Sequence, residues 1–129
     1  MVFPTATDHC DTHDVGGRDL DARLELSGTE AVRGEAFPYR IINTGTARLI
    51  CGADYVLERE AGGEWVVMNS RMAFAPIGLI VEPGHDKQLK APIPSDAPSG
   101  QHRISTSVSC EAPPPSPRSL RLSALFHIR

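Results

Sequence analysis

The chain has 129 residues, a formal net charge of −3 and a pI of about 5.9. This length fits one domain that buries about two thirds of its unfolded surface, and a composition of 40% hydrophobic and 22% charged residues excludes global disorder. An acidic net charge argues against nucleic-acid binding, which needs a concentrated basic patch. The sequence has no apolar run of about 18 residues, so we expect no membrane-spanning helix.

The charges are unevenly distributed along the chain. Residues 1–30 hold seven acids and two arginines (net −5), whereas residues 101–129 hold four arginines and one acid (net +3). We expect attraction between the first and last strands, with a two-part partner surface as the alternative.

Residues 1–19 have no hydrophobic period and are predicted to be an irregular lead-in to a folded domain at 20–129. Leu20–Leu26 alternates between apolar and polar residues and is the first predicted strand. Glu35–Asn43 is the second, with Pro38 expected at its beginning or at a bulge, because proline cannot donate to a β-ladder.

Two β-rich runs, Leu49–Arg59 and Glu64–Met68, flank Gly62-Gly63 and predict a β-hairpin. Trp65, the only tryptophan, opens the returning strand. We expect the two sheets to close around this side chain.

The segment Asn69–Pro83 is more apolar than an ordinary loop. It is predicted to cross between sheets and close the edge of the core, with an exposed adhesive patch as the alternative. Three further strands are predicted at Asp86–Ala91, Gln101–Ser109 and Ser119–Ile128. The proline-rich segments Pro92–Gly100 and Glu111–Pro117 are read as rigid connections between them.

Seven strands with regular turn signals and no amphipathic helix predict an all-β fold, a seven-stranded immunoglobulin-like antiparallel β-sandwich. The layout over about residues 20–128 resembles the bacterial immunoglobulin-like domains of secreted and cell-envelope proteins. The matching stretches are Tyr39–Asn43 before a Thr-Gly turn, Gly52-x-x-Tyr55-x-Leu57-Glu58-Arg59, Gly63-Glu64-Trp65, Pro83-Gly84, Gly100-x-x-Arg103-Ile104 and Ala124-x-Phe126.

The sequence departs from this pattern at Cys51, where such domains often carry an aromatic residue, and at Gln101-His102, where they often have x-Tyr. The resemblance implies a non-catalytic accessory module, usually outside the cytoplasm, without a ligand. No signal peptide follows Met1, so a cytoplasmic location is the alternative to an extracellular or cell-envelope one.

Three cysteines are expected near one end of the sandwich. Cys51 begins the third predicted strand, Cys110 ends the sixth, and Cys10 precedes the first. A disulfide between Cys51 and Cys110 is possible if they face each other, and Cys10 is the alternative partner of either. Three reduced thiols are the cytosolic alternative.

A metal site is a further alternative, because His9, Cys10 and His13 are zinc or copper ligands at close spacing. No Cys-x-x-Cys pair accompanies them, so we predict no metal and no cofactor.

No catalytic motif is present, and we predict that the chain is not an enzyme. The acids Asp54, Glu58, Glu60 and Glu64 are expected on solvated strand faces. His102 and His127 are expected to point outward from their strands.

The function predicted first is a non-catalytic interaction module whose partner is a protein or a cell-surface component. Its expected contact loops contain Asn43 and Thr44 and the stiff connector residues Pro113, Pro114 and Pro115. The alternative is an inhibitor of the bacterial intracellular proteinase inhibitor type, acting through an extended loop at Asn69–Ile80 or Pro92–Ser99.

Overall fold

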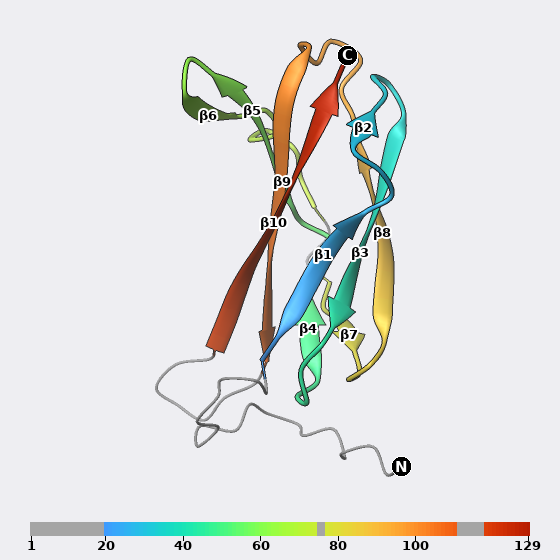
Figure 1. Ribbon diagram of the computed structural model, residues 1–129. Coiled ribbons are helices and arrows are strands. Elements are labelled where there is room, and N and C mark those ends of the chain that lie inside the picture. The colour runs from blue at the N-terminus through green and yellow to red at the C-terminus, as the bar shows by residue number, and fades with distance from the viewer. Residues whose placement is uncertain (1–19, 75–76, 111–117) are drawn as a thin grey trace.

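A computed structural model describes residues 20–74, 77–110 and 118–129, and these residues form two facing β-sheets with no helix among them (Figure 1). The first sheet has the order β1-β3-β8, and both of its pairings are antiparallel. Its strands are β1 (Ala22–Leu26), β3 (Ala36–Asn43) and β8 (Asp86–Pro92).

The second sheet is organised around β9 (Gly100–Cys110). One side of β9 pairs along its whole length with β10 (Arg118–Ile128), which in turn pairs in parallel with the short β2 (Glu30–Ala31). The other side pairs first with β5 (Val56–Ala61) and then with β4 (Leu49–Cys51). The edges beyond them are β6 (Glu64–Val67) next to β5 and β7 (Leu79–Val81) next to β4.

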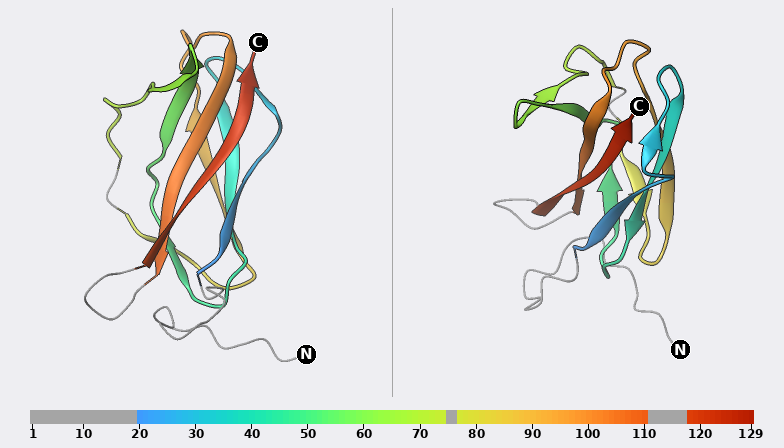
Figure 2. Two further views of the ribbon diagram at one scale, coloured as in Figure 1. Left: turned by 60° about the vertical axis from the view of Figure 1, so that its left-hand side comes forward. Right: turned by 45° about the horizontal axis from the view of Figure 1, so that its top comes forward.

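The two sheets face each other (Figure 2), and alternating side chains from both fill the space between them. Phe37 and Tyr39 of β3 project from the first sheet. Phe37 meets Phe126 of β10, and Tyr39 meets Tyr55, which directly precedes β5. The centroids of Phe37 and Phe126 lie 5.2 Å apart, and those of Tyr39 and Tyr55 lie 6.2 Å apart. Ile41, Leu57 and Ile104 complete the centre of this core and are at most 1% exposed.

The predicted all-β, two-sheet architecture is confirmed, but the count of seven strands is not, because the described residues form ten. The predicted strand Leu49–Arg59 is interrupted at residues 52–55, so it becomes β4 and β5. The Thr106 hydroxyl of β9 donates to the Asp54 carbonyl (2.9 Å) within this interruption. The remaining additions are the short strands β2 and β7, whose two and three residues are too few to give a periodic signal.

Pro38 is the third residue of β3, the central strand of the first sheet. Its carbonyl accepts a hydrogen bond from Ser27 N (3.1 Å), immediately after β1 ends at Leu26. The carbonyl and the N–H position of one residue point to the same side of an antiparallel strand. The N–H that proline lacks would therefore face Ser27, beyond the end of β1. Its absence removes no hydrogen bond within the β1–β3 ladder.

The segment Asn69–Pro83 does not cross between the sheets, because β6 and β7 belong to the same sheet and the crossing lies between β7 and β8. Within it, Phe74 packs against Tyr55 with ring centroids 5.0 Å apart. Met72, Ile77 and Ile80 are instead between 42% and 53% exposed.

Candidate functional site

The predicted contact loop at Asn43 is held by the Asn43 side chain itself. Its Nδ2 donates to the carbonyls of Ala47 (2.8 Å) and Val81 (2.9 Å), and its Oδ1 accepts from Gly45 N (2.9 Å). Asn43 is only 1% exposed, whereas Thr44 is exposed. Asn43 therefore shapes this loop, and Thr44 is the member of the pair that a partner could touch. Pro113, Pro114 and Pro115 lie outside the described residues.

The β4–β9 register places Cys51 opposite Val108, and Cys110 lies two residues further along β9. Cys51 is a free thiol that is 1% exposed, so it is not one half of the predicted bridge. Burial raises the pKa of Cys51, and the nearby Asp54 carboxylate adds to the increase. The Cys51 thiol is therefore protonated and unreactive at neutral pH.

The metal candidates His9, Cys10 and His13 lie outside the described residues. Within 20–74, 77–110 and 118–129, no group of three His, Cys, Asp or Glu side chains is placed to hold a metal ion. In the same ranges, no helix is long and apolar enough to cross a membrane.

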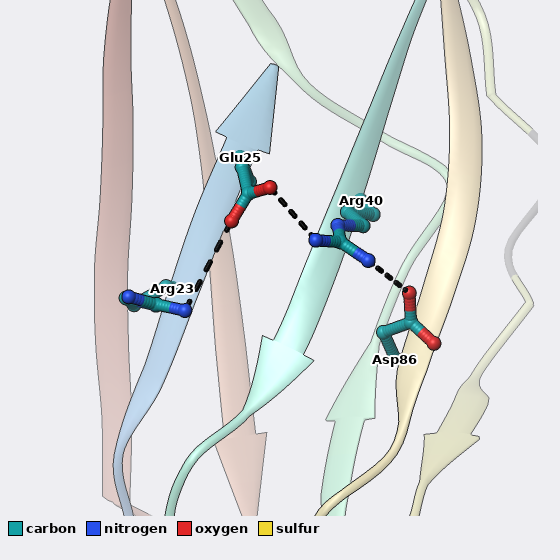
Figure 3. Close-up of polar contacts among 4 residues, drawn as sticks. All are labelled: Arg23, Glu25, Arg40 and Asp86. Carbon is teal, nitrogen blue, oxygen red and sulfur yellow. Dashed lines mark hydrogen bonds and ion pairs between the residues drawn. The ribbon is translucent and has the colours of Figure 1, made fainter. Parts of the chain in front are cut away.

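The outer face of the first sheet carries a row of charged side chains from all three strands (Figure 3). Arg40 of β3 contacts Glu25 of β1 (Nη2–Oε1, 2.7 Å) and Asp86 of β8 (Nη1–Oδ2, 3.2 Å), while Arg23 lies 3.9 Å from the other Glu25 oxygen. These side chains are 38–68% exposed, so each pair contributes little to stability. Because Glu25 and Asp86 neutralise Arg40, Arg40 itself is not available to an anionic ligand.

His102 is fully buried, contrary to the prediction that it points outward. It follows the same alternation as Ile104 and Val108 and so faces the core, stacked on Phe126 with ring centroids 5.5 Å apart. Its Nδ1 lies 3.0 Å from the Gly100 carbonyl, which makes Nδ1 the protonated nitrogen, and Nε2 has no hydrogen-bond partner among the described residues. Burial lowers the pKa of His102 below the ordinary histidine value, so the imidazole is neutral at pH 7.

The β5–β6 hairpin projects from the second sheet (Figure 1), and its Glu58 and Trp65 form a cluster with Arg103 of β9. Nε and Nη2 of Arg103 donate to Glu58 Oε1 at 3.0 and 2.9 Å, and the guanidinium carbon lies 4.4 Å from the centroid of the Trp65 ring. Glu58 is only 7% exposed, so its predicted position on a solvated face is wrong. Trp65 lies half-buried on the hairpin and does not occupy the centre of the core as expected.

A groove of about 480 Å³ separates this hairpin from the loop Pro94–Pro98, and we call it the hairpin groove. The hairpin contributes Arg59, Val66 and Val67 to its lining, and the loop contributes Pro94, Asp96 and Pro98. Val66 and Val67 are 38% and 46% exposed. This groove was not predicted from the sequence, although Val66 and Val67, two adjacent valines after a Gly-Gly turn on a short strand, were a visible signal.

The remaining acids differ in their surroundings. Asp54, Glu60 and Glu64 are exposed, as predicted, and so is His127 on β10. Arg129, which follows β10, donates its Nε to Glu30 Oε1 of β2 at 2.6 Å. Among the described residues, no ion pair joins the first and last predicted strands themselves.

Comparisons with known proteins give one family and several distant structures. No curated protein sequence matches the chain. The domain shares 15% identity with each of three solved structures. One is Pseudomonas fluorescens alkylpurine DNA glycosylase AlkC bound to DNA containing an abasic site analog. That match covers 85% of this chain and 31% of the AlkC chain, with a TM-score of 0.44. For PapD-like domain 7 of human CEP192 the coverages are 83% and 85% with a TM-score of 0.40, and for the sporulation control protein Spo0M of Bacillus subtilis they are 83% and 48% with a TM-score of 0.36.

The sequence therefore spans about a third of the AlkC chain. These weak likenesses concern backbone shape and carry no conclusion about activity. The family comparison is more direct: the model of the bacterial Ig-like domain matches residues 21–126, which include every strand of both sheets except the end of β10. This chain belongs to the bacterial Ig-like domain family.

Proposed function

We propose that the chain is a non-catalytic interaction module of a bacterial cell-envelope or secreted protein, and that it binds a protein partner through the end of the sandwich that carries the β5–β6 hairpin. The observation that supports this most is the exposed pair Val66 and Val67 next to the Trp65–Arg103 contact. Tryptophan and arginine are the residue types most enriched at the energetic centres of protein interfaces. Exposed apolar side chains beside such a pair favour protein binding over a purely structural role.

The cysteines support a location outside the cytoplasm. Cys51 is free, whereas Cys110 is disulfide-bonded. As the partner of Cys110 we propose Cys10, which lies outside the described residues. A structural disulfide forms and persists in oxidising compartments, and one that closes a loop of about 100 residues contributes about 4 to 5 kcal/mol in the loop-entropy model.

A photo-crosslinking amino acid placed at position 67, with the same amino acid at position 44 as a matched control, tests the function in the bacterium that encodes the protein. We expect a discrete adduct from position 67 that excess unlabelled domain suppresses. An adduct from position 44 alone would return the contact surface to the Asn43–Arg48 loop. The absence of a competable adduct at both positions would refute the interaction role.

The protease-inhibitor hypothesis gains no support from the described residues. In the candidate loop Pro92–Ser99, Ile93 and Ala97 are buried, and Arg33 ties the Ala97 carbonyl and the Ser99 hydroxyl to the domain. This loop is packed onto the sandwich and does not project from it, as an extended inhibitory loop would.

A further inference from the structure

The outer edge of β6 presents a regular row of unused main-chain groups. Met68 N donates to Leu57 O at 2.7 Å, in the same register that pairs Val67 with Glu58. Hydrogen-bonded and non-bonded pairs alternate along an antiparallel ladder, so the N–H and C=O groups of Trp65 and Val67 point away from β5. In the part of the chain that the structure describes, β6 pairs with β5 alone and these four groups have no partner.

The loop Pro94–Pro98 faces this edge as a stiff wall. Ala97 N donates to Pro94 O (3.2 Å), and Arg33 holds the Ala97 carbonyl and the Ser99 hydroxyl. The two prolines lack N–H groups and add apolar surface. The volume of about 480 Å³ between the two walls lies in the range of about 300–1,000 Å³ that is common for ligand sites.

The charges around the groove are predominantly acidic. Glu58 is neutralised by Arg103. Glu60, Glu64 and Asp96 are exposed, and no ion pair engages them within the described residues. Asp96 and Arg59 are the charged residues of the lining and balance each other. Glu60 and Glu64 add two negative charges on the hairpin and Arg33 adds one positive charge at the loop, so the charges in and around the groove sum to −1. An occupant of complementary charge is basic.

We propose that the hairpin groove binds an extended, basic segment of the partner protein, which adds to β6 as a further β-strand. The free groups of Trp65 and Val67 form main-chain hydrogen bonds with this segment, as in other cases of strand addition. Alternate side chains of the segment then lie against Val66 with the loop prolines, or against Val67 with Trp65, while its lysines or arginines approach Glu60 and Asp96. The proposal rests on the interaction function above and names the chemistry of the occupant.

Two blocked peptides, Lys-Thr-Val-Thr-Val-Lys and Glu-Thr-Val-Thr-Val-Glu, serve as probes. The single tryptophan, Trp65, lies on β6 next to the groove-lining Val66, so its fluorescence reports binding along this strand. The decisive variant is Val67→Pro, because the N–H it removes takes no part in the β5–β6 ladder. Val67→Ala is its matched control, since it trims the side chain but keeps the N–H. The thermal midpoint of each variant shows whether the domain remains folded.

We expect the lysine peptide to bind about tenfold or more tightly than the glutamate peptide and to weaken as salt is added. Val67→Pro is expected to weaken binding about tenfold or more, and Val67→Ala about threefold or less. The amides of Trp65 and Val67 should become protected from hydrogen exchange when the lysine peptide binds.

Equal binding by Val67→Pro and Val67→Ala, or no binding of the lysine peptide by the wild-type domain, would overturn the proposal. Self-association of the domain that Val67→Pro abolishes, without peptide binding, would assign the edge to a second copy of this chain. The crosslinking amino acid can also be placed at a position next to 67 in the Val67→Pro variant. If that variant still gives the cellular adduct while the domain binds no peptide, the interaction function stands and strand addition at β6 does not.

Discussion

The buried His102 should make the domain lose stability in mild acid. The imidazole is 0% exposed, and its pKa is lowered below the ordinary histidine value of 6.5 mainly by burial, with the hydrogen bond to Gly100 opposing this. The charged or titratable groups that act on it are all basic, namely His127, Arg59 and Arg33, and all of them lower the pKa further. Protonation would therefore add a buried cation where no carboxylate is placed to compensate for it.

The sign of the effect follows from proton linkage. Below about pH 6.5 the unfolded chain takes up a proton at this position while the folded domain does not, so stability is complete above that pH and falls as the pH decreases toward the folded pKa. The slope cannot exceed about 1.4 kcal/mol per pH unit, so the loss at pH 5.5 is at most about 1.4 kcal/mol. This is a substantial part of the 5–15 kcal/mol that is typical of a domain.

Urea unfolding of the wild type and of His102→Leu at about pH 8 and about pH 5.5 measures this contribution. At the higher pH, His102→Leu should lose about 1 kcal/mol with the hydrogen bond to Gly100. Its stability should then change less between the two pH values than that of the wild type, by no more than the limit calculated above. His85→Asn, in an exposed turn, serves as the control and should behave as the wild type. Equal pH dependence in wild type and His102→Leu would refute the reasoning.

Three further predictions concern other parts of the molecule. Replacing Arg103 by Met should destabilise the domain by about 2–3 kcal/mol in thermal unfolding, because Glu58 is left nearly buried without its counter-charge. Adding Glu58→Gln should recover part of this loss, and an unchanged midpoint in the Arg103→Met variant would contradict the prediction. Asn43→Ala should cost about 2–5 kcal/mol in chemical denaturation, since three backbone groups lose their partner, whereas Thr44→Ala should cost less than about 0.5 kcal/mol; equal losses would contradict the structural role of Asn43. Thiol counting in denaturant without reductant should detect one free thiol, absent in Cys51→Ala, while three reactive thiols would exclude the Cys10–Cys110 bridge.

The sequence predicted the strands whose two faces differ in polarity. Alternation identified β1, β3, β9 and β10, and the Gly62-Gly63 turn was correct because both glycines adopt positive φ values (60° and 86°) suited to a two-residue hairpin. The strands β2 and β7, of two and three residues, were not predicted, because alternation is visible only in a longer run. His102 was misassigned although it shares the parity of Ile104, because a polar residue type outweighed its position in the alternation.

The candidate site was less predictable because it depends on pairings between distant segments. The burial of Glu58 follows from the approach of Arg103, which is 45 residues away. The hairpin groove exists only because the loop Pro94–Pro98 lies opposite β6. Trp65 was expected in the core because large aromatic residues usually are buried, but contact with a guanidinium lets the ring remain at the surface.

The central position of β9 has a consequence for the order in which the nascent chain can fold. All three strands of the first sheet have been synthesised once Pro92 is made, yet their apolar faces have nothing to cover them until β9 and β10 follow. Because β4 and β5 each wait for the same late strand, the domain has few local contacts and should fold slowly, on the millisecond-to-second scale of β-sandwiches. A translocation machine that needs an unfolded polypeptide would have time to engage it before the second layer closes.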